Sequence, residues 1–322
     1  MAWLVKIKDR ISSSSPALFL VKKSKQTLIP GFRGIPLYDV INFFFKEVRT
    51  VGMTERASSI AFNFVMAIPP AIIFLFTLIP YLPISGEFEQ SLYGLIKDAV
   101  PGEKDHQTII NFLADFINHP RNGLLSLGFI LSLYFSSNAI MGIMRSFDKN
   151  YAGFRKRTLF QKRGAALKIT IVIFVFIFIS ILLLVAQGAV LSWLGIKSQL
   201  LRTVIVNLRW VVLILLIFAS ISYIYRHAPA VEKKWRMISP GSILACFLTL
   251  VFTGFFSWWV SHFGQYNQLY GSIGSVLILM ALIYFNSLVL LIGFELNVSI
   301  TSLKKIADER NNMPADGEVK SG

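Results

Sequence analysis

A carboxylate and two amides stand in one strongly apolar stretch near the C-terminus, YFNSLVLLIGFELN at 284–297. These polar residues are Asn286, Glu295 and Asn297. A charged side chain that faces lipid near the bilayer centre costs roughly 3 kcal/mol or more. We therefore expect all three residues to face other helices or a water-filled cavity. There a carboxylate pairs with a cation or exchanges a proton, and an amide binds a polar group.

The helical period separates these residues into two faces. At about 100° per residue, Asn286, Gly293 and Asn297 fall within about 40° of one another, and Glu295 lies about 180° from Asn286. A helix that is polar on two opposite sides cannot face lipid broadly. The last apolar helix is therefore predicted to be surrounded by other helices or to line a cavity on one side.

Further polar residues are expected in the membrane, and together they form a candidate cavity cluster. Its members are Asn63, Ser137, Asn138, Asn286, Glu295 and Asn297. The candidate charge partners of Glu295 are the arginines at the inner ends of the spans: Arg56, Arg145 and Arg226. Two interpretations stay open. The cluster either holds the helices together, or it lines a cytoplasm-facing cavity that binds a polar group.

Residue patterns typical of enzymes are missing from the chain. The four histidines, at 106, 119, 227 and 262, are scattered without metal-ligand spacing, and there is no Walker A loop, no GxSxG and no CxxC. The single cysteine, Cys246, excludes an intrachain disulfide. We therefore predict a protein that is not an enzyme and that needs no metal or cofactor.

The elements that position these residues are long apolar blocks. Of the 322 residues, 54% are hydrophobic and only 15% are charged, whereas soluble domains are nearer a quarter charged. Six blocks reach the roughly 20 residues needed to cross a bilayer. They are 58–82, 123–145, 168–190, 204–226, 242–263 and 273–299. The composition predicts an all-α integral membrane protein with six transmembrane helices.

Lysine and arginine alternate between rich and poor segments along the chain. The rich segments, 1–57, 145–168, 226–241 and 300–322, hold 10, 8, 4 and 4 of them, while the loops between hold 3, 2 and 0. The positive-inside rule then places both termini in the cytoplasm. The net charge of +15 is explained by topology and by anionic lipid headgroups at the inner surface, so no nucleic-acid partner is expected.

Two regions outside the spans have helical patterns. Residues 37–50 place Leu37, Ile41, Phe44, Phe45 and Val48 on one face, which predicts an amphipathic helix on the inner interface. The loop 83–122 carries two apolar stripes separated by Pro101-Gly102, which predicts an outer helical hairpin. The predicted organisation is a basic cytoplasmic segment at 1–35, a membrane domain at 36–303 and a disordered polar tail at 304–322.

Three stretches resemble a known family. They are RASSIAFNFVMAIPPAIIFLF (56–76), YRHAPAVEKKWRMISPGSILA (225–245) and YGSIGSVLILMALIYFNSLVLLIGFELN (270–297). They are similar to the YihY/virulence factor BrkB family of bacterial inner-membrane proteins, formerly labelled ribonuclease BN, and the likeness spans about 38–302. Leu282, Phe294 and Phe62 depart from the residues frequent there, while Glu295 and Asn297 are kept. The resemblance implies a multi-pass protein of the bacterial inner (cytoplasmic) membrane, but no settled biochemical function.

Two classes of function remain open from the sequence. The first is transport or lipid handling through the cytoplasm-facing polar cavity, with Glu295 as a charge partner or a proton-coupled acid. The alternative is a non-transporting membrane scaffold that contacts envelope proteins through the outer hairpin and the inner loops. The partner is then an envelope protein or, in a homo-oligomer, a second copy of the chain. The residues give no support to a ribonuclease.

Overall fold

The structure is a computed structural model. It describes residues 22–27, 30–32, 34–50, 52–78, 107, 110–111, 114–115, 122–148, 157–185, 199–232, 234–263 and 272–312. The outer hairpin expected at 83–122 falls almost wholly outside these residues, so it stays a prediction.

The described part of the chain is helical, as its composition predicts. Its long helices are α3 (Leu37–Thr50), α4 (Met53–Leu78), α7 (Asn122–Phe147), α8 (Leu159–Val185), α10 (Gln199–His227), α11 (Pro240–Phe263) and α13 (Ser272–Asn312). All except α3 are long and apolar enough to cross a membrane, which makes six candidate spans in the described residues. This number agrees with the six apolar blocks in the sequence.

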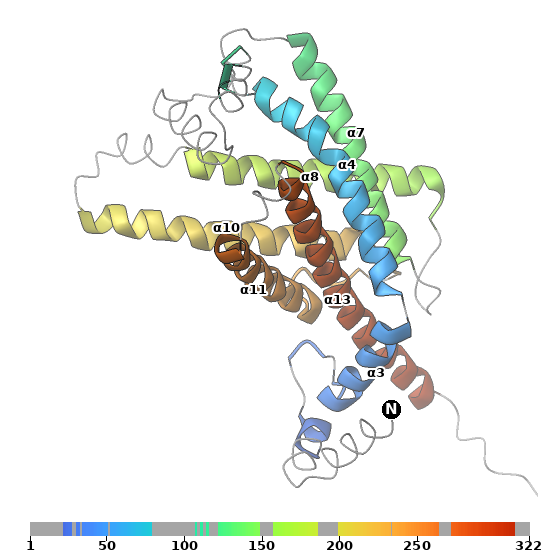
Figure 1. The fold of residues 1–322 in the computed structure, drawn as a ribbon. Coiled ribbons are helices and arrows are strands. Elements are labelled where there is room, and N and C mark those ends of the chain that lie inside the picture. Colours follow the sequence, from blue (N-terminus) through green and yellow to red (C-terminus); the bar gives the residue numbers. More distant parts are fainter. Residues whose placement is uncertain are drawn as a thin grey trace, which may run out of the picture.

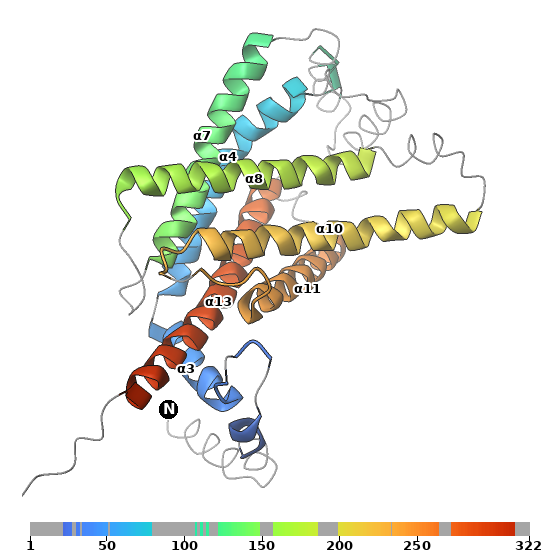
Figure 2. The same cartoon turned by 180° about the vertical axis from the view of Figure 1, so that it is seen from behind.

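The six long helices pack as a closed ring of neighbours. Going round it, α4 contacts α7, α7 contacts α8, α8 contacts α10, α10 contacts α11, α11 contacts α13, and α13 returns to α4. Figures 1 and 2 show α8 and α10 side by side, running across the direction of α4 and α7. Since α13 also contacts α7, the last helix lies inside the bundle on that side, as its two polar faces predict.

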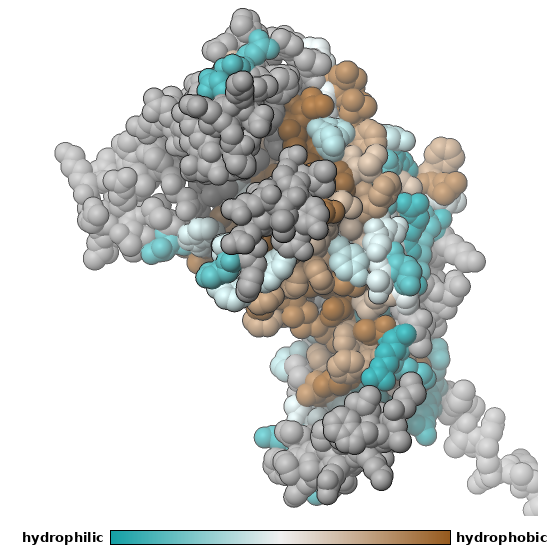
Figure 3. All heavy atoms as spheres, viewed as in Figure 1, coloured by the Kyte–Doolittle hydropathy of each residue, from teal (hydrophilic) through white to brown (hydrophobic). Residues whose placement is uncertain are grey.

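Many apolar side chains of the spans are exposed. Figure 3 shows brown apolar residues over the middle of the molecule and teal hydrophilic residues around its margins. Large exposed side chains such as Phe62 and Trp210 belong to this apolar surface. An exposed apolar surface of this extent is typical of helices that face lipid, because apolar side chains in lipid do not have the free-energy cost of contact with water.

Helix α3 forms where the amphipathic pattern predicts it, and part of its surface docks on the protein. Val40 is fully buried and packs with Phe32, Ile35 and Ile300, so α3 is docked on α13. Ile41 and Phe45, which belong to the predicted apolar face, are exposed. The face divides because one side of the helix finds a protein partner and the other is left for the membrane interface.

The last helix is longer than the sequence predicts. It continues from Ser272 to Asn312, so residues 304–312, expected as part of a disordered tail, are helical. Ile300 and Leu303 pack against the residues around α3, and the Lys304 Nζ lies 2.8 Å from an Asp308 carboxylate oxygen one turn later. These tertiary contacts and the i,i+4 ion pair stabilise the extension of the helix.

Candidate functional site

One end of the bundle gathers the basic residues, and we call it the basic end. Here α4, α8 and α11 begin, and α7 and α10 end. Arg56 Nη1 donates to the Ser146 carbonyl (2.9 Å), which joins the start of α4 to the end of α7. Arg157 Nη1 donates to the Ala228 carbonyl (2.9 Å), which joins the segment before α8 to the segment after α10. The positive-inside rule predicts that this end is cytoplasmic.

Glycines bring the backbones of α11 and α13 into contact at this end. A Cβ placed on Gly241 would lie 2.1 Å from the Gly293 carbonyl oxygen, and one on Gly293 would lie 2.5 Å from the Gly241 carbonyl oxygen. Ala245, one turn further along α11, lies at the same crossing. Small residues permit this approach, which is how helices associate in lipid without a hydrophobic driving force between them.

Asn297 completes the N-terminal cap of α11. The Ser239 Oγ accepts from the Ser242 N–H (3.2 Å) and the Ser242 Oγ accepts from the Ser239 N–H (3.0 Å), with Pro240 as the first helical residue. The Gly241 N–H donates to the Asn297 Oδ1 (2.9 Å), and the Asn297 Nδ2 donates to the Ser239 Oγ (3.0 Å). Both ends of the Asn297 amide are thus used within the protein.

Replacing Asn297 with alanine should destabilise the protein by about 1–2 kcal/mol, because the buried Gly241 N–H loses its acceptor. Unfolding by dodecyl sulfate in mixed micelles, followed by circular dichroism, measures the change. Thr301→Ala is the matched control, since the Thr301 hydroxyl only bonds back to the Asn297 carbonyl of its own helix. Equal stability of the two variants would contradict the capping role.

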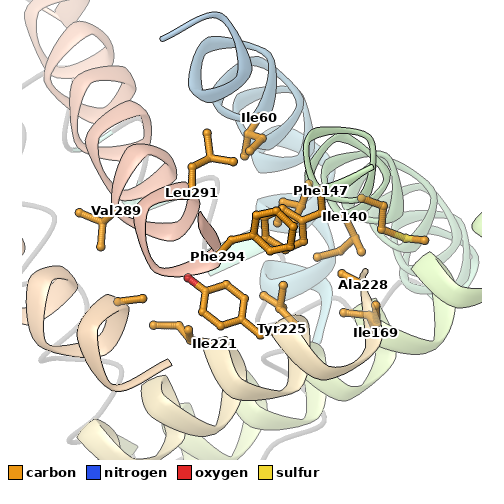
Figure 4. Close-up of a cluster of buried hydrophobic side chains, with 14 of the residues drawn as sticks. Ile60, Ile140, Phe147, Ile169, Ile221, Tyr225, Ala228, Val289, Leu291 and Phe294 are labelled. Atoms are coloured by element: carbon orange, nitrogen blue, oxygen red, sulfur yellow. The ribbon is translucent and has the colours of Figure 1, made fainter. Parts of the chain in front are cut away.

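Phe294 occupies the aromatic centre of the bundle. Its ring is fully buried and stacks on Phe147 of α7, with centroids 3.9 Å apart and planes at 3°. Figure 4 shows these two overlapping rings with Tyr225 of α10 beside them. The Tyr225 hydroxyl donates to the Leu290 carbonyl (2.6 Å). Helix α11 approaches α13 most closely at Gly293, which has no side chain. The next residue, Phe294, points towards α7, so its large ring does not obstruct this approach.

Glu295 is fully buried, with 0% of its surface exposed. Figure 4 shows Leu291, one turn before it, pointing towards Ile60 of α4, which packs in the same cluster. The two helices run in opposite directions, so one further turn on each reaches Glu295 on α13 and Arg56 on α4. Of the three candidate charge partners, Arg56 therefore lies on the helix and at the level expected to face Glu295.

The other candidate arginines lie elsewhere at the basic end. Arg145 is exposed, and Arg226 is half-buried at the end of α10. The structure therefore separates the three arginines. The assignment of Arg56, Arg145 or Arg226 as the partner of Glu295 stays a prediction.

The remaining candidate residues are divided among several contacts. Asn63 donates from Nδ2 to the Ser59 carbonyl (2.7 Å) and packs over Gly142, where α4 meets α7. Ser137 is buried and donates to the Tyr134 carbonyl (2.7 Å). These are contacts that hold helices and side chains in place, in line with the first interpretation of the cluster.

Asn138 and Asn286 differ in how completely their amides are bonded. The Asn138 Oδ1 accepts from Arg163 Nη1 (2.6 Å), and the Arg163 guanidinium lies 4.4 Å from the centre of the Tyr134 ring. Asn286 donates from Nδ2 to the Leu282 carbonyl (3.0 Å), but its Oδ1 is buried without a hydrogen-bond partner among the described residues. The six candidates are therefore distributed over α4, α7 and α13, and whether they line one common cavity stays a prediction.

A cleft of about 380 Å³ opens between α8 and α10 at the basic end, and we call it the α8–α10 cleft. It is lined by Arg157, Gln161, Gly164, Ala165, Lys168, Ile169, Tyr223, His227 and Lys234. Arg157, Lys168 and Lys234 give it three cations, and the described residues of its lining include no carboxylate. The cleft is therefore electropositive, which favours an anion.

Arg157 holds the end of α10 in place beside this cleft. Its guanidinium donates to the carbonyls of His227 (3.2 Å), Ala228 (2.9 Å) and Pro229 (3.2 Å). Partial burial lowers the pKa of Arg157 from its ordinary value, and the nearby carboxylate of Asp148 opposes this effect. The guanidinium remains charged, because arginine is not deprotonated in proteins. It satisfies carbonyls that the helix leaves unbonded and adds positive charge to the cleft.

A second cleft, of about 610 Å³, lies at the start of α11 and along the end of α13, and we call it the α11–α13 cleft. Lys234 lines both clefts. The second cleft also contains Arg236, Lys304 and Asn297, together with the carboxylate of Asp308, which pairs with Lys304. Its charge is thus partly balanced within the protein, unlike that of the α8–α10 cleft.

Of the cleft residues, the lysines and the arginine entered the sequence analysis only as counts for topology. A usable signal exists, because Gln161, Gly164 and Lys168 recur at the helical spacing i, i+3, i+7 and so share one face of α8. Arg157 comes four residues earlier. The contribution of Tyr223, His227 and Lys234 from the other wall is a tertiary contact between α8 and α10 and has no local signal.

Comparison with known proteins supports the architecture. The family model described as "Virulence factor BrkB" matches residues 44–318. The chain is 29% identical over 258 residues to a Bacillus subtilis (strain 168) protein named "Putative ribonuclease-like protein YfkH", which covers 79% of this chain and 92% of that protein. No solved structure matches the chain.

Shorter likenesses join the chain to proteins named as membrane proteins. A UPF0761 membrane protein of Tolumonas auensis is 31% identical over 86 residues, covering 27% of this chain and 28% of that protein. A second, from Idiomarina loihiensis, is 31% identical over 91 residues, covering 28% and 32%. Since the family model spans most of the chain and agrees with the motifs quoted above, this chain belongs to the virulence factor BrkB family of multi-pass membrane proteins.

Proposed function

We propose that the protein is a lipid-handling protein of the cytoplasmic membrane, which binds anionic phospholipid headgroups at its basic end. In this proposal both termini lie in the cytoplasm and the basic end faces the inner leaflet. The distribution of lysine and arginine along the chain supports this orientation. Each basic residue near an anionic surface contributes about 1 kcal/mol of attraction.

The observation that carries this proposal is the position of cationic clefts beside exposed apolar side chains. Leu159 and Phe160, at the start of α8, are 76% and 91% exposed, and Ile238, which lines the α11–α13 cleft, is 70% exposed. An anionic phospholipid has the same two parts, a charged headgroup and apolar chains. Basic clefts bordered by such side chains therefore match both parts at once.

We propose that Glu295 acts in lipid handling through an ion pair with an arginine. A proton that binds the carboxylate, or an anionic group that binds the arginine, would break this ion pair. The complete burial of Glu295, its depth near the basic end and the arginine on the facing helix support this role. The same features suit a purely structural ion pair, which breaking would destabilise strongly. A neutral isostere separates these roles, because it keeps the shape of the side chain.

The proposal predicts that the purified protein retains phosphatidylglycerol in preference to phosphatidylcholine. Native mass spectrometry of protein extracted from mixed vesicles counts the lipids retained. Equal retention of the two lipids would overturn lipid handling at the basic end and favour the scaffold alternative. Glu295→Gln should keep the retained phosphatidylglycerol but slow the movement of a fluorescent analogue between leaflets of reconstituted vesicles. If the variant merely unfolds, Glu295 is structural.

A further inference from the structure

We propose that the α8–α10 cleft is a specific binding site for the phosphate group of a lipid headgroup. This inference rests on the proposed function and assigns it a site. Its ligand is a phosphate, presented by a phospholipid that enters from the side of the exposed apolar face of α8. Lys168 and Lys234 supply the charge, Arg157 positions the wall of the cleft, and Gly164 leaves the space.

Lys168 is the residue that most requires such a ligand. It lies nine residues into α8, which is about 13 Å along the helix, and it falls within the candidate span Leu159–Ser180. Its side chain is nevertheless exposed and lines the cleft. An ammonium at the inner border of the apolar block 168–190 pairs with an anion or reaches the interface, since facing lipid alone is costly. The cleft provides the route, and a headgroup phosphate provides the anion.

The neighbouring polar groups suit a phosphate better than a cation or a neutral ligand. Three cations line the cleft, and no carboxylate stands among the lining residues that the structure describes. Gln161, at its mouth, offers an amide N–H₂. Tyr223 stacks on His227 with ring centres 4.1 Å apart, and the His227 Nδ1 lies 3.0 Å from the Tyr223 carbonyl.

The geometry at Gly164 gives the cleft its depth. A Cβ built on this glycine meets nothing within 4 Å, and the residue lines the cleft between Gln161 and Lys168. A larger side chain here would project into the space without striking the protein. Glycine lowers helix stability relative to larger residues, so the space is obtained at some cost to α8. This position allows the cleft to be closed without changing any charge.

Two variants test the site. Gly164→Leu should fill the cleft and lower retention of phosphatidylglycerol by about tenfold, the loss that corresponds to one strong charge-assisted contact. Lys168→Gln should lower it by about fivefold through the loss of one cation. Binding is measured by native mass spectrometry at graded phosphatidylglycerol content, beside a matched series with inorganic phosphate in detergent.

Matched controls are available for both changes. Gly254 of α11 is exposed, and a Cβ on it also meets nothing within 4 Å, so Gly254→Leu repeats the first change away from the cleft. Lys305 lies near the basic end of α13 and lines neither cleft, so Lys305→Gln repeats the second. Both controls should bind like the wild type.

The outcomes separate this inference from the proposed function. If the wild type prefers phosphatidylglycerol and both cleft variants equal their controls, the α8–α10 cleft is not the site, although lipid handling stands. If the wild type retains phosphatidylglycerol and phosphatidylcholine equally, the proposed function is wrong, and the site proposed here is wrong with it. Inorganic phosphate that binds the wild type as strongly as phosphatidylglycerol would overturn the lipid as the source of the phosphate. Weak or absent binding of inorganic phosphate, with loss of lipid in both variants, supports the site.

Discussion

Gly293→Ala is expected to destabilise the protein by at least about 3 kcal/mol, the upper part of the range for overpacked sites. The added methyl group would lie 2.5 Å from the Gly241 carbonyl oxygen, 2.5 Å from the Tyr225 hydroxyl and 2.7 Å from the Ala245 Cβ. Two of these atoms belong to rigid neighbours, so the strain is relieved only by separating α11 from α13. Unfolding in mixed micelles, followed by circular dichroism, measures the loss.

Gly254→Ala is the matched control, because the same substitution is expected to change the stability in the opposite direction. Nothing lies within 4 Å of a Cβ at Gly254, so the same change there should stabilise α11 by up to about 1 kcal/mol through helix propensity. Opposite signs at two glycines on packed helices identify a backbone contact. Two variants that are both neutral would show that α11 and α13 do not meet at Gly293.

Phe294→Ala is expected to have an effect of similar size, about 3–5 kcal/mol, because a large buried ring would be replaced by a cavity. Its ring stacks on Phe147 at 3.9 Å and lies 5.6 Å from the ring of Trp235, both measured between centroids. Neighbours from three parts of the chain define the space, so they cannot collapse together into it. The free energy of unfolding in mixed micelles again measures the change.

Phe62→Ala serves as the control for the loss of an aromatic ring. Phe62 lies on α4 with 62% of its surface exposed, so its removal leaves no internal cavity and should cost less than about 1 kcal/mol in micelles. Phe294→Leu should lie between the two, since it keeps part of the volume. A variant Phe294→Ala as stable as Phe62→Ala would contradict the aromatic centre shown in Figure 4.

Local patterns in the sequence were sufficient to predict the helices. Apolar blocks of about 20 residues predict six spans, and all six are found, because membrane insertion depends on summed side-chain hydrophobicity, a local property. The family was also recognisable from the motif that contains Glu295 and Asn297. The end of α13 was wrong because contacts of Ile300 and Leu303 with a distant segment, which no local window contains, extend the helix.

The sequence was sufficient to single out the candidate polar residues, but it did not predict their hydrogen-bond partners. Asn297 was predicted to line a polar cavity shared with Glu295, and its amide is bonded to the cap of α11, 56 residues earlier in the chain. Asn138 was expected beside Glu295, whereas its amide accepts a hydrogen bond from Arg163 of α8. Partners of this kind depend on which helices are neighbours, and helix periodicity does not specify neighbours.

The sequence by itself determined that this protein is an all-helical membrane protein of the virulence factor BrkB family, with a basic face at one end of its spans. It also identified Glu295 as a buried carboxylate, since hydrophobicity, periodicity and the cost of a charge in lipid are all properties of the chain alone. Only the tertiary structure decided that Gly164 and Lys168 face Tyr223 and Lys234 across a cleft. A cleft exists only where two helices diverge, and their packing is set by contacts between residues far apart in the chain.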